Sequence, residues 1–154
     1  MDRSMLEHDA TSYNSAINSC EKHAEWQKAS ALLAALYQAM LEPTTISFNS
    51  STSACEKGVE WPEALALLAA MGLAILEPDI ISYSSAIRAC EKGAEWRRAR
   101  ALLTAMSKEL LKADTISYDA AVSAYGKGRP GPDAICHSVI VIVVEKGADW
   151  QMAL

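Results

Sequence analysis

Histidines are the residues of this sequence that most readily suggest acid–base or metal chemistry. His8, His23 and His137 each stand alone, because none has a partner at the spacing of a metal site. No serine or cysteine lies in a motif that would activate it as a nucleophile. We therefore expect a protein without catalytic activity, metal or cofactor.

Cysteines are the next candidates. Cys20, Cys55 and Cys90 are spaced by 35 residues. If they occupy the same place in successive layers of helices, they lie roughly 10 Å apart, whereas a disulfide needs Cα atoms within about 7 Å. We therefore expect these three cysteines to be small apolar core residues of a protein in a reducing compartment. We expect the same of Cys136.

A literal G-x-G-x-x-G is formed by Gly126, Gly128 and Gly131. In dinucleotide-binding proteins this motif follows a strand and opens a helix. Here a predicted helix precedes it and Pro132 follows it, so nucleotide binding is disfavoured.

The cysteine spacing belongs to a 35-residue repeat, and a repeat of this length predicts a solenoid or a related array. A fragment of it returns at 145–150 after a shortened unit. The same spacing relates the serines Ser12, Ser47, Ser82 and Ser117, the aromatic residues Tyr13, Phe48, Tyr83 and Tyr118, and the tryptophans Trp26, Trp61 and Trp96.

Each full unit reads as two helices, because its apolar residues recur at helical spacing, as in Tyr83, Ile87 and Cys90. Gly58 and Gly93 are expected to close the first helices with a positive φ. The second helices carry a similar apolar stripe, represented by Ala99, Leu102, Leu103 and Met106.

Two further residues mark helix ends. His23 takes the place of the closing glycine in the first unit, and we interpret it as a cap. Pro62 suits the first turn of a second helix.

One hairpin cannot bury its own apolar stripe, so the units must stack. The predicted fold is all-α, a right-handed α-solenoid of helix-turn-helix repeats. After an N-terminal segment, 1–10, we define unit 1 as 11–45, unit 2 as 46–80, unit 3 as 81–115, the truncated unit 4 as 116–133 and a partial fifth unit as 134–154.

The composition fits this interpretation. The chain has 154 residues, 51% of them hydrophobic, and a net charge of -5, typical of one folded domain. We expect no membrane span, because the longest apolar run is too short. No targeting segment is evident at the start. The acidic balance argues mildly against sequence-independent binding of nucleic acid.

The motifs of the repeat resemble those of the pentatricopeptide repeat family. In unit 2 they are Ile46-Ser47-Phe48-Asn49, Ala64, Met71 and Pro78-Asp79. In unit 3 they are Ile81-Ser82-Tyr83-Ser84, Ala99, Met106 and Asp114, and the likeness extends from Thr11 to Pro132. The tetratricopeptide repeat, a protein-binding relative, has a different pattern of Trp, Leu, Gly and Tyr.

The resemblance implies that the first helices hold single-stranded RNA, one base per unit. The residue after each aromatic side chain and the last residue of the same unit would together read the base. These predicted reader pairs are Asn14 with Thr44, Asn49 with Asp79, and Ser84 with Asp114.

By the family pattern, Asn49/Asp79 reads uracil and Ser84/Asp114 reads guanine, while Asn14/Thr44 leans towards pyrimidines. The implied target therefore has a pyrimidine-U-G core. The bases would be held between aliphatic side chains, namely Ile46 and Ile81, with Thr11 as a weaker counterpart.

An alternative for each reader is an ordinary helix cap, since Asn, Ser and Asp are common there. Arg88, on a first helix beside Ser84, is the candidate for contacting phosphate. Arg97, Arg98 and Arg100 lie on a second helix, and we interpret them as a solvated surface.

The pattern breaks in unit 4, whose second helix is missing. We predict that 134–146 fills the empty second-helix position, because a short connection places a helix antiparallel to its predecessor. A strand is the alternative, since 139–144 is rich in β-branched residues. Asp119 and Ser138 are therefore not expected to read bases.

The sequence thus predicts RNA binding by a short array, in organellar (chloroplast or mitochondrial) transcript processing, editing or stability by resemblance. The alternative is a protein-binding helical scaffold without RNA affinity. Because solenoids need polar caps at their ends, self-association through the C-terminal face is also possible.

Overall fold

A computed structural model of the chain describes residues 3–109, 111 and 115–128. All regular secondary structure in this part is α-helical, and this part contains no strand. Predictions for 129–154, including the helix at 134–146, Cys136 and the C-terminal face, lie outside the described residues. The helices are α1 (Arg3–Lys22), α2 (Trp26–Gln38), α3 (Thr45–Gly58), α4 (Trp61–Leu73), α5 (Ile80–Lys92), α6 (Trp96–Lys108) and α7 (Thr115–Gly128).

The helices follow the 35-residue period of the sequence. The helices α3, α5 and α7 begin at Thr45, Ile80 and Thr115, and their partners α2, α4 and α6 each begin at a tryptophan. The helix α1 differs, because it begins at Arg3 and so extends into the segment before unit 1.

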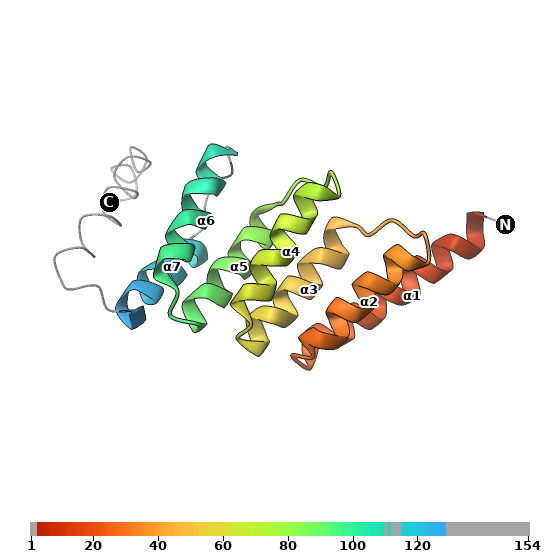
Figure 1. The fold of residues 1–154 in the computed structure, drawn as a ribbon, viewed down its shortest axis with the longest axis horizontal. Coiled ribbons are helices and arrows are strands. Elements are labelled where there is room, and N and C mark those ends of the chain that lie inside the picture. The colour runs from red at the N-terminus through yellow and green to blue at the C-terminus, as the bar shows by residue number, and fades with distance from the viewer. Residues whose placement is uncertain (1–2, 110, 112–114, 129–154) are drawn as a thin grey trace.

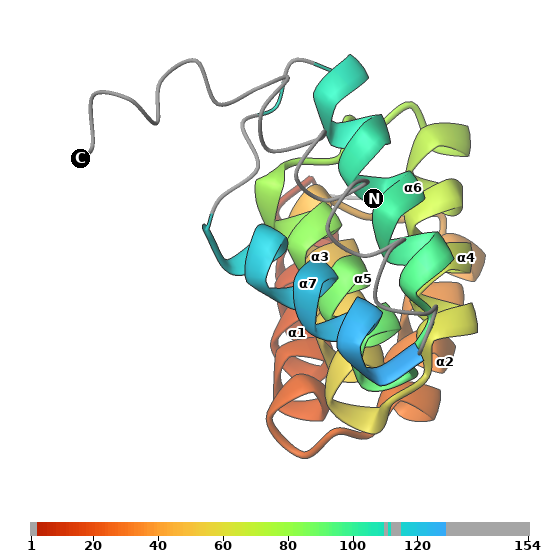
Figure 2. The ribbon, with the colours of Figure 1, turned by 90° about the vertical axis from the view of Figure 1, so that its left-hand side faces the viewer.

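The helices form two layers (Figures 1 and 2). Odd-numbered helices pack directly on one another, and each even-numbered helix packs between the odd-numbered helix before it and the one after it. Viewed along the array, the odd-numbered helices lie on one side and the even-numbered ones on the other. The predicted all-α solenoid of stacked hairpins is therefore confirmed. We call the odd-numbered set the first-helix layer.

The prediction that Gly58 and Gly93 close helices with a positive φ is wrong. The left-handed residues come one position later, at Val59 (φ 63) and Ala94 (φ 57), and no described glycine has a positive φ. In unit 1 the left-handed residue is likewise one position later than predicted, at Ala24 and not at His23. The amide N–H after each of these residues donates to the carbonyl five positions earlier, as in the bond from Glu60 to Cys55 of 2.9 Å.

The glycines serve packing between units. A Cβ on Gly58 would lie 2.6 Å from Cδ1 of Trp26, and one on Gly93 would lie 2.3 Å from Cδ1 of Trp61. Each tryptophan therefore packs on the next unit. His23 occupies the equivalent position of unit 1. Its Nδ1 lies 2.9 Å from the Ser19 carbonyl oxygen.

The core lies between the layers. Ala29, Ala64 and Ala99 are fully buried where paired helices meet, and Phe48 and Tyr83 are buried within the first-helix layer. The three described cysteines, Cys20, Cys55 and Cys90, are buried and unpaired, as predicted.

Their surroundings make two of these thiols poor acids. Burial, with a contribution from Glu63, raises the pKa of Cys55 to about 12. Burial likewise raises the pKa of Cys90 to about 11. Neither thiol is therefore ionised near neutral pH, which suits a filler of the core.

Among the described helices, none is both long enough and apolar enough to cross a membrane.

Candidate nucleic-acid interface

Exposed isoleucines mark one edge of the first-helix layer. Ile46, Ile81 and Ile116 lie at the starts of α3, α5 and α7 and are 70%, 60% and 55% exposed. Thr11, at the same position of unit 1, is also exposed. A row of exposed aliphatic side chains at a constant interval is the kind of surface that a ligand covers.

The predicted reader pair of unit 2 lies beside this row, because Asn49 is three residues after Ile46 on the same helix. The Nδ2 group of Asn49 donates to both carboxylate oxygens of Asp79, at 3.1 and 3.3 Å. Its Oδ1 accepts from the hydroxyl of Ser82 at 2.6 Å. The structure therefore brings Asn49 and Asp79 together.

The reader pair of unit 1 is arranged differently. The hydroxyl of Ser47 donates to Oδ1 of Asn14 at 2.5 Å, which matches the bond from Ser82 to Asn49. Within the described residues no hydrogen bond joins Asn14 to Thr44, whose side chain faces Ser47 instead. Asn14 and Thr44 are thus linked only through the serine.

In unit 3 the hydroxyl of Ser84 lies 2.8 Å from that of Ser117 on α7. Its predicted partner Asp114 is outside the described residues. We call Ser47, Ser82 and Ser117 the bridging serines, since each joins the first reader of one unit to the following helix. All three are buried.

The capping alternative is also realised. Thr44 and Asp79 are the N-caps of α3 and α5, and each forms a reciprocal capping box with its bridging serine. The Ser82 amide donates to Oδ1 of Asp79 at 2.9 Å. Capping therefore places these two side chains at the edge where the readers lie, so the two roles are compatible.

A second set of contacts crosses the layer nearer the helix C-termini. Glu21, Glu56 and Glu91, which we call the carboxylate ladder, each accept from a lysine 36 residues later in the sequence. The lysine to glutamate distances are 3.2, 3.1 and 2.7 Å for Lys57, Lys92 and Lys127. These pairs tie each unit to the next.

Arg88, the predicted phosphate contact, belongs to this ladder. Its Nη2 lies 3.3 Å from Oε1 of Glu56, a side chain only 6% exposed. In the neighbouring units the equivalent positions are serines, which donate to Glu21 and Glu91. The guanidinium is thus partly neutralised but keeps 45% of its side chain exposed.

A groove between α5 and α7 connects Arg88 with the isoleucine edge. It measures about 450 Å³ and is lined by Arg88, Ile116 and Asp119, among others. Arg88 therefore opens on the same groove as Ile116 of the isoleucine edge. The prediction that Asp119 does not read a base rests on 134–146, outside the described residues.

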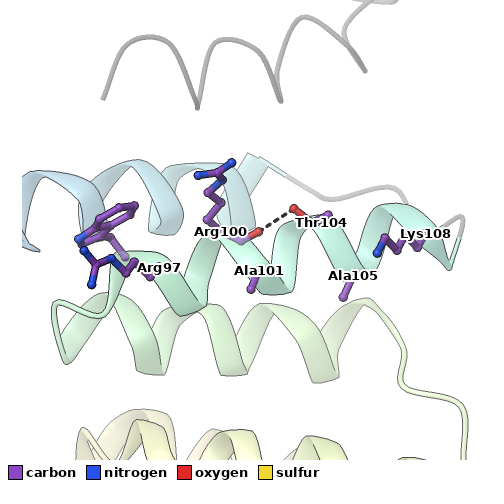
Figure 3. Close-up of a pocket in the computed structure, with 7 residues that line it drawn as sticks. Arg97, Arg100, Ala101, Thr104, Ala105 and Lys108 are labelled. Atoms are coloured by element: carbon purple, nitrogen blue, oxygen red, sulfur yellow. Dashed lines mark hydrogen bonds between the residues drawn. The ribbon is translucent and has the colours of Figure 1, made fainter. Parts of the chain in front are cut away.

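Arg97, Arg98 and Arg100 lie on α6, in the other layer, and are exposed, as predicted. Arg97 and Arg100 extend from α6 along a shallow groove (Figure 3). The Arg97 guanidinium lies 5.1 Å from the ring centre of Trp96, and that of Arg98 lies 4.8 Å from the ring centre of Trp61. The Arg98 contact joins α6 to α4, whereas that of Arg97 lies within α6.

In the part of the chain that the structure describes, no group of three or more His, Cys, Asp or Glu residues is placed to hold a metal ion.

Among the solved structures that share this fold are two of one pentatricopeptide repeat protein. One is the crystal structure of the pentatricopeptide repeat protein PPR10 in complex with an 18-nt psaJ RNA element, and the other is of a PPR10 variant with three Cys-to-Ser changes and the same element. Each is 22% identical to this chain, with a TM-score of 0.73, over 90% of this chain and 20% of PPR10. No protein-family profile matches the chain, and no curated protein matches its sequence.

The fold is therefore that of a pentatricopeptide repeat array, as the sequence motifs predicted. The chain spans about a fifth of the length of PPR10, since it matches 20% of that chain.

Sequence reasoning missed the roles of the bridging serines and the carboxylate ladder. Both sets recur at the 35-residue interval and were therefore visible as conserved spacing within the chain. The period alone does not show which layer they face, and only the packed hairpins place Ser82 against Asn49.

Proposed function

We propose that this chain binds single-stranded RNA along the first-helix layer, with one base for each unit. The observation that carries the proposal is the repeated pairing, on one edge, of an exposed isoleucine with a hydrogen-bonding side chain three residues later. Ile46 precedes Asn49, and Ile81 precedes Ser84. An aliphatic side chain covers the face of a base, and the polar group contacts its edge.

The unit 2 pair has the hydrogen-bonding capacity for uracil. Asn49 uses one N–H on Asp79 and one lone pair on Ser82, which leaves one N–H donor and one oxygen lone pair. Asp79 keeps lone pairs on its carboxylate. The pair thus offers a donor for a uracil carbonyl and acceptors for its single N–H.

In this proposal, contacts to phosphate contribute little to the affinity for RNA. Lys57, Lys92 and Lys127 of the first helices are engaged with the carboxylate ladder, and Arg88 shares Glu56. Because neutralised phosphates set the salt dependence of binding, we expect a shallow dependence on ionic strength.

PPR10 supports this proposal, since the structure similar to this chain is a complex with RNA. We further propose, from the family resemblance, that the chain serves transcript processing, editing or stability in a chloroplast or mitochondrion. Binding without catalysis is part of the proposal.

A titration of short RNAs tests it. An RNA with a pyrimidine-U-G core should bind more tightly than a scrambled RNA of the same composition. Asn49→Asp should lose most of this preference, because it places two carboxylates together and removes the amide donor. Arg100→Ala, on the opposite layer, is the matched control and should change nothing.

Equal affinity for the two RNAs would contradict sequence-specific binding. Absence of binding to either would favour the alternative, a helical scaffold for protein partners.

A further inference from the structure

The bridging serines form the same contact at all three joints between units. Ser47 donates to Asn14 at 2.5 Å, Ser82 donates to Asn49 at 2.6 Å, and Ser117 lies 2.8 Å from Ser84. Each contact joins two units. On one side is the reader that follows the aromatic residue, and on the other is the third residue of the first helix of the following unit. The serines lie beneath the readers, since all three are buried.

In unit 2 this contact completes a closed ring of hydrogen bonds. The Ser82 hydroxyl has one proton, and its distance of 2.6 Å to Asn49 is shorter than the 2.9 Å to Asp79. The Asn49 amide then donates to Asp79, and Asp79 accepts from the Ser82 backbone. Every donor in the ring faces an acceptor.

The ring selects one orientation of the Asn49 amide. If the amide were flipped, its oxygen would face the Asp79 carboxylate, and two acceptors would oppose each other. With the observed orientation the unused N–H and lone pair stay available at the isoleucine edge. The Asp79 carboxylate therefore selects the orientation, and the Ser82 hydroxyl holds it by donating to the amide oxygen.

We propose that Ser47, Ser82 and Ser117 are positioning residues for base reading, so that each unit orients the reader of the unit before it. This inference rests on the proposed RNA binding for its functional consequence. A plain capping role differs from it, because the local bond from the Asp79 amide to Ser82 Oγ completes the cap without Asn49.

The side-chain amide of Asn49 gives a test that needs no RNA. In NMR spectra of the full chain, Ser82→Ala should shift the Asn49 amide signals and leave those of Asn14 in place. Ser47→Ala should do the reverse, and Ser82→Thr, which keeps the hydroxyl, should restore the Asn49 signals. Asn49 side-chain amide signals that do not shift in Ser82→Ala would overturn the proposal.

A second test measures how strongly the chain discriminates between bases. Ser82→Ala should reduce the preference for uracil over the other bases at the unit 2 position by roughly fivefold, as one hydrogen bond would. Discrimination at the unit 3 position should be unchanged. Ser53→Ala is the matched control, because it removes another hydroxyl contact between units, the one to Glu21 at 3.1 Å.

The outcomes separate the two proposals. A uniform loss of affinity with intact discrimination would mean that Ser82 only stabilises the fold, and would overturn the positioning role. Failure of the unaltered chain to bind RNA would overturn the proposed function and with it the reading role. The amide signals would still report whether the serine orients Asn49.

Discussion

The joint between units 1 and 2 and the joint between units 2 and 3 have the same geometry but different chemistry. At the first joint the Asn14 side chain accepts from Ser47, and no hydrogen bond joins it to Thr44. At the second joint Asn49 is held by both Ser82 and a charged Asp79. The reader of unit 2 is therefore fixed from two sides.

The carboxylate ladder shows the same contrast. Glu21 accepts from Ser53 and Lys57 and is 25% exposed. Glu56 accepts from two cations, Arg88 and Lys92, and is only 6% exposed.

This difference shows that the period fixes the geometry of a solenoid but not the strength of each joint. Stability in such arrays is approximately a sum over units and their nearest-neighbour contacts. We therefore expect opening to begin in unit 1 and to reach the second joint last.

The largest expected effect comes from crowding the second joint. Gly93→Ala places a methyl group against Trp61, where a Cβ would lie 2.3 Å from Cδ1. We expect a loss of about 2 to 3 kcal/mol in the free energy of unfolding, measured by urea denaturation. His23→Ala, at the equivalent position of unit 1, should change stability by less than about 0.5 kcal/mol. Equal losses would refute the packing role of the glycine.

The next effect compares the two carboxylates. Glu56→Gln leaves Arg88 and Lys92 without their anion, and should cost about 2 kcal/mol, less than a fully buried pair because both cations are partly exposed. Glu21→Gln should cost about 0.5 kcal/mol. Chemical denaturation of both variants would test this, and a larger cost for Glu21 would reverse our ranking of the joints.

A smaller effect should stabilise the chain. Val59 is a β-branched residue with a φ of 63° at the end of α3, a conformation that L-residues adopt at a cost. Val59→Gly should raise the free energy of unfolding by about 0.5 to 1 kcal/mol in thermal denaturation. Ala24→Gly, at the same place in unit 1, should raise the free energy of unfolding by less. A loss of stability in Val59→Gly would show that the valine side chain contributes packing.

The smallest effect is a pH dependence at the third joint. Burial raises the pKa of Glu91, but hydrogen bonds from Lys127 and Ser123 outweigh it, so the net pKa lies below the ordinary value of 4.5. A carboxyl with a lowered folded pKa stabilises the fold above the unfolded value, and this stability is lost as pH falls through the folded value.

Lys127→Met should therefore flatten the decline in stability below about pH 4.5. Denaturation curves at pH 3 to 6, compared with those of the unaltered chain, would measure it. If the free energy of unfolding of Lys127→Met declined with falling pH as steeply as that of the unaltered chain, Glu91 would be excluded as the source of the decline.

The layered fold could be predicted because period and apolar spacing act together. Trp26, Trp61 and Trp96, which share the 35-residue spacing, begin the second helices. Local turn chemistry misled the prediction at Gly58. Glycine is common both at positive φ and at close approaches, and only the Trp26 ring in the neighbouring unit distinguishes them.

The site could be predicted only in part, for a similar reason. The resemblance indicated Asn49 and Asp79, and the structure places them in contact. The place of Arg88 beside Ser84 indicated a phosphate contact, but its pairing with Glu56 depends on a neighbouring helix. Contacts between units cannot be read from the period, because each unit shows the same spacing whatever it faces.

The central claim is that one reader pair meets one base. Asn49→Ser gives unit 2 the same Ser and Asp pair that unit 3 carries in Ser84 and Asp114. Affinities for four RNAs that differ only at the unit 2 nucleotide would test the claim directly. We predict that the preferred base changes from uracil to guanine by roughly tenfold, with no change at the neighbouring position. A preference that stays with uracil, or no preference in either protein, would contradict the account.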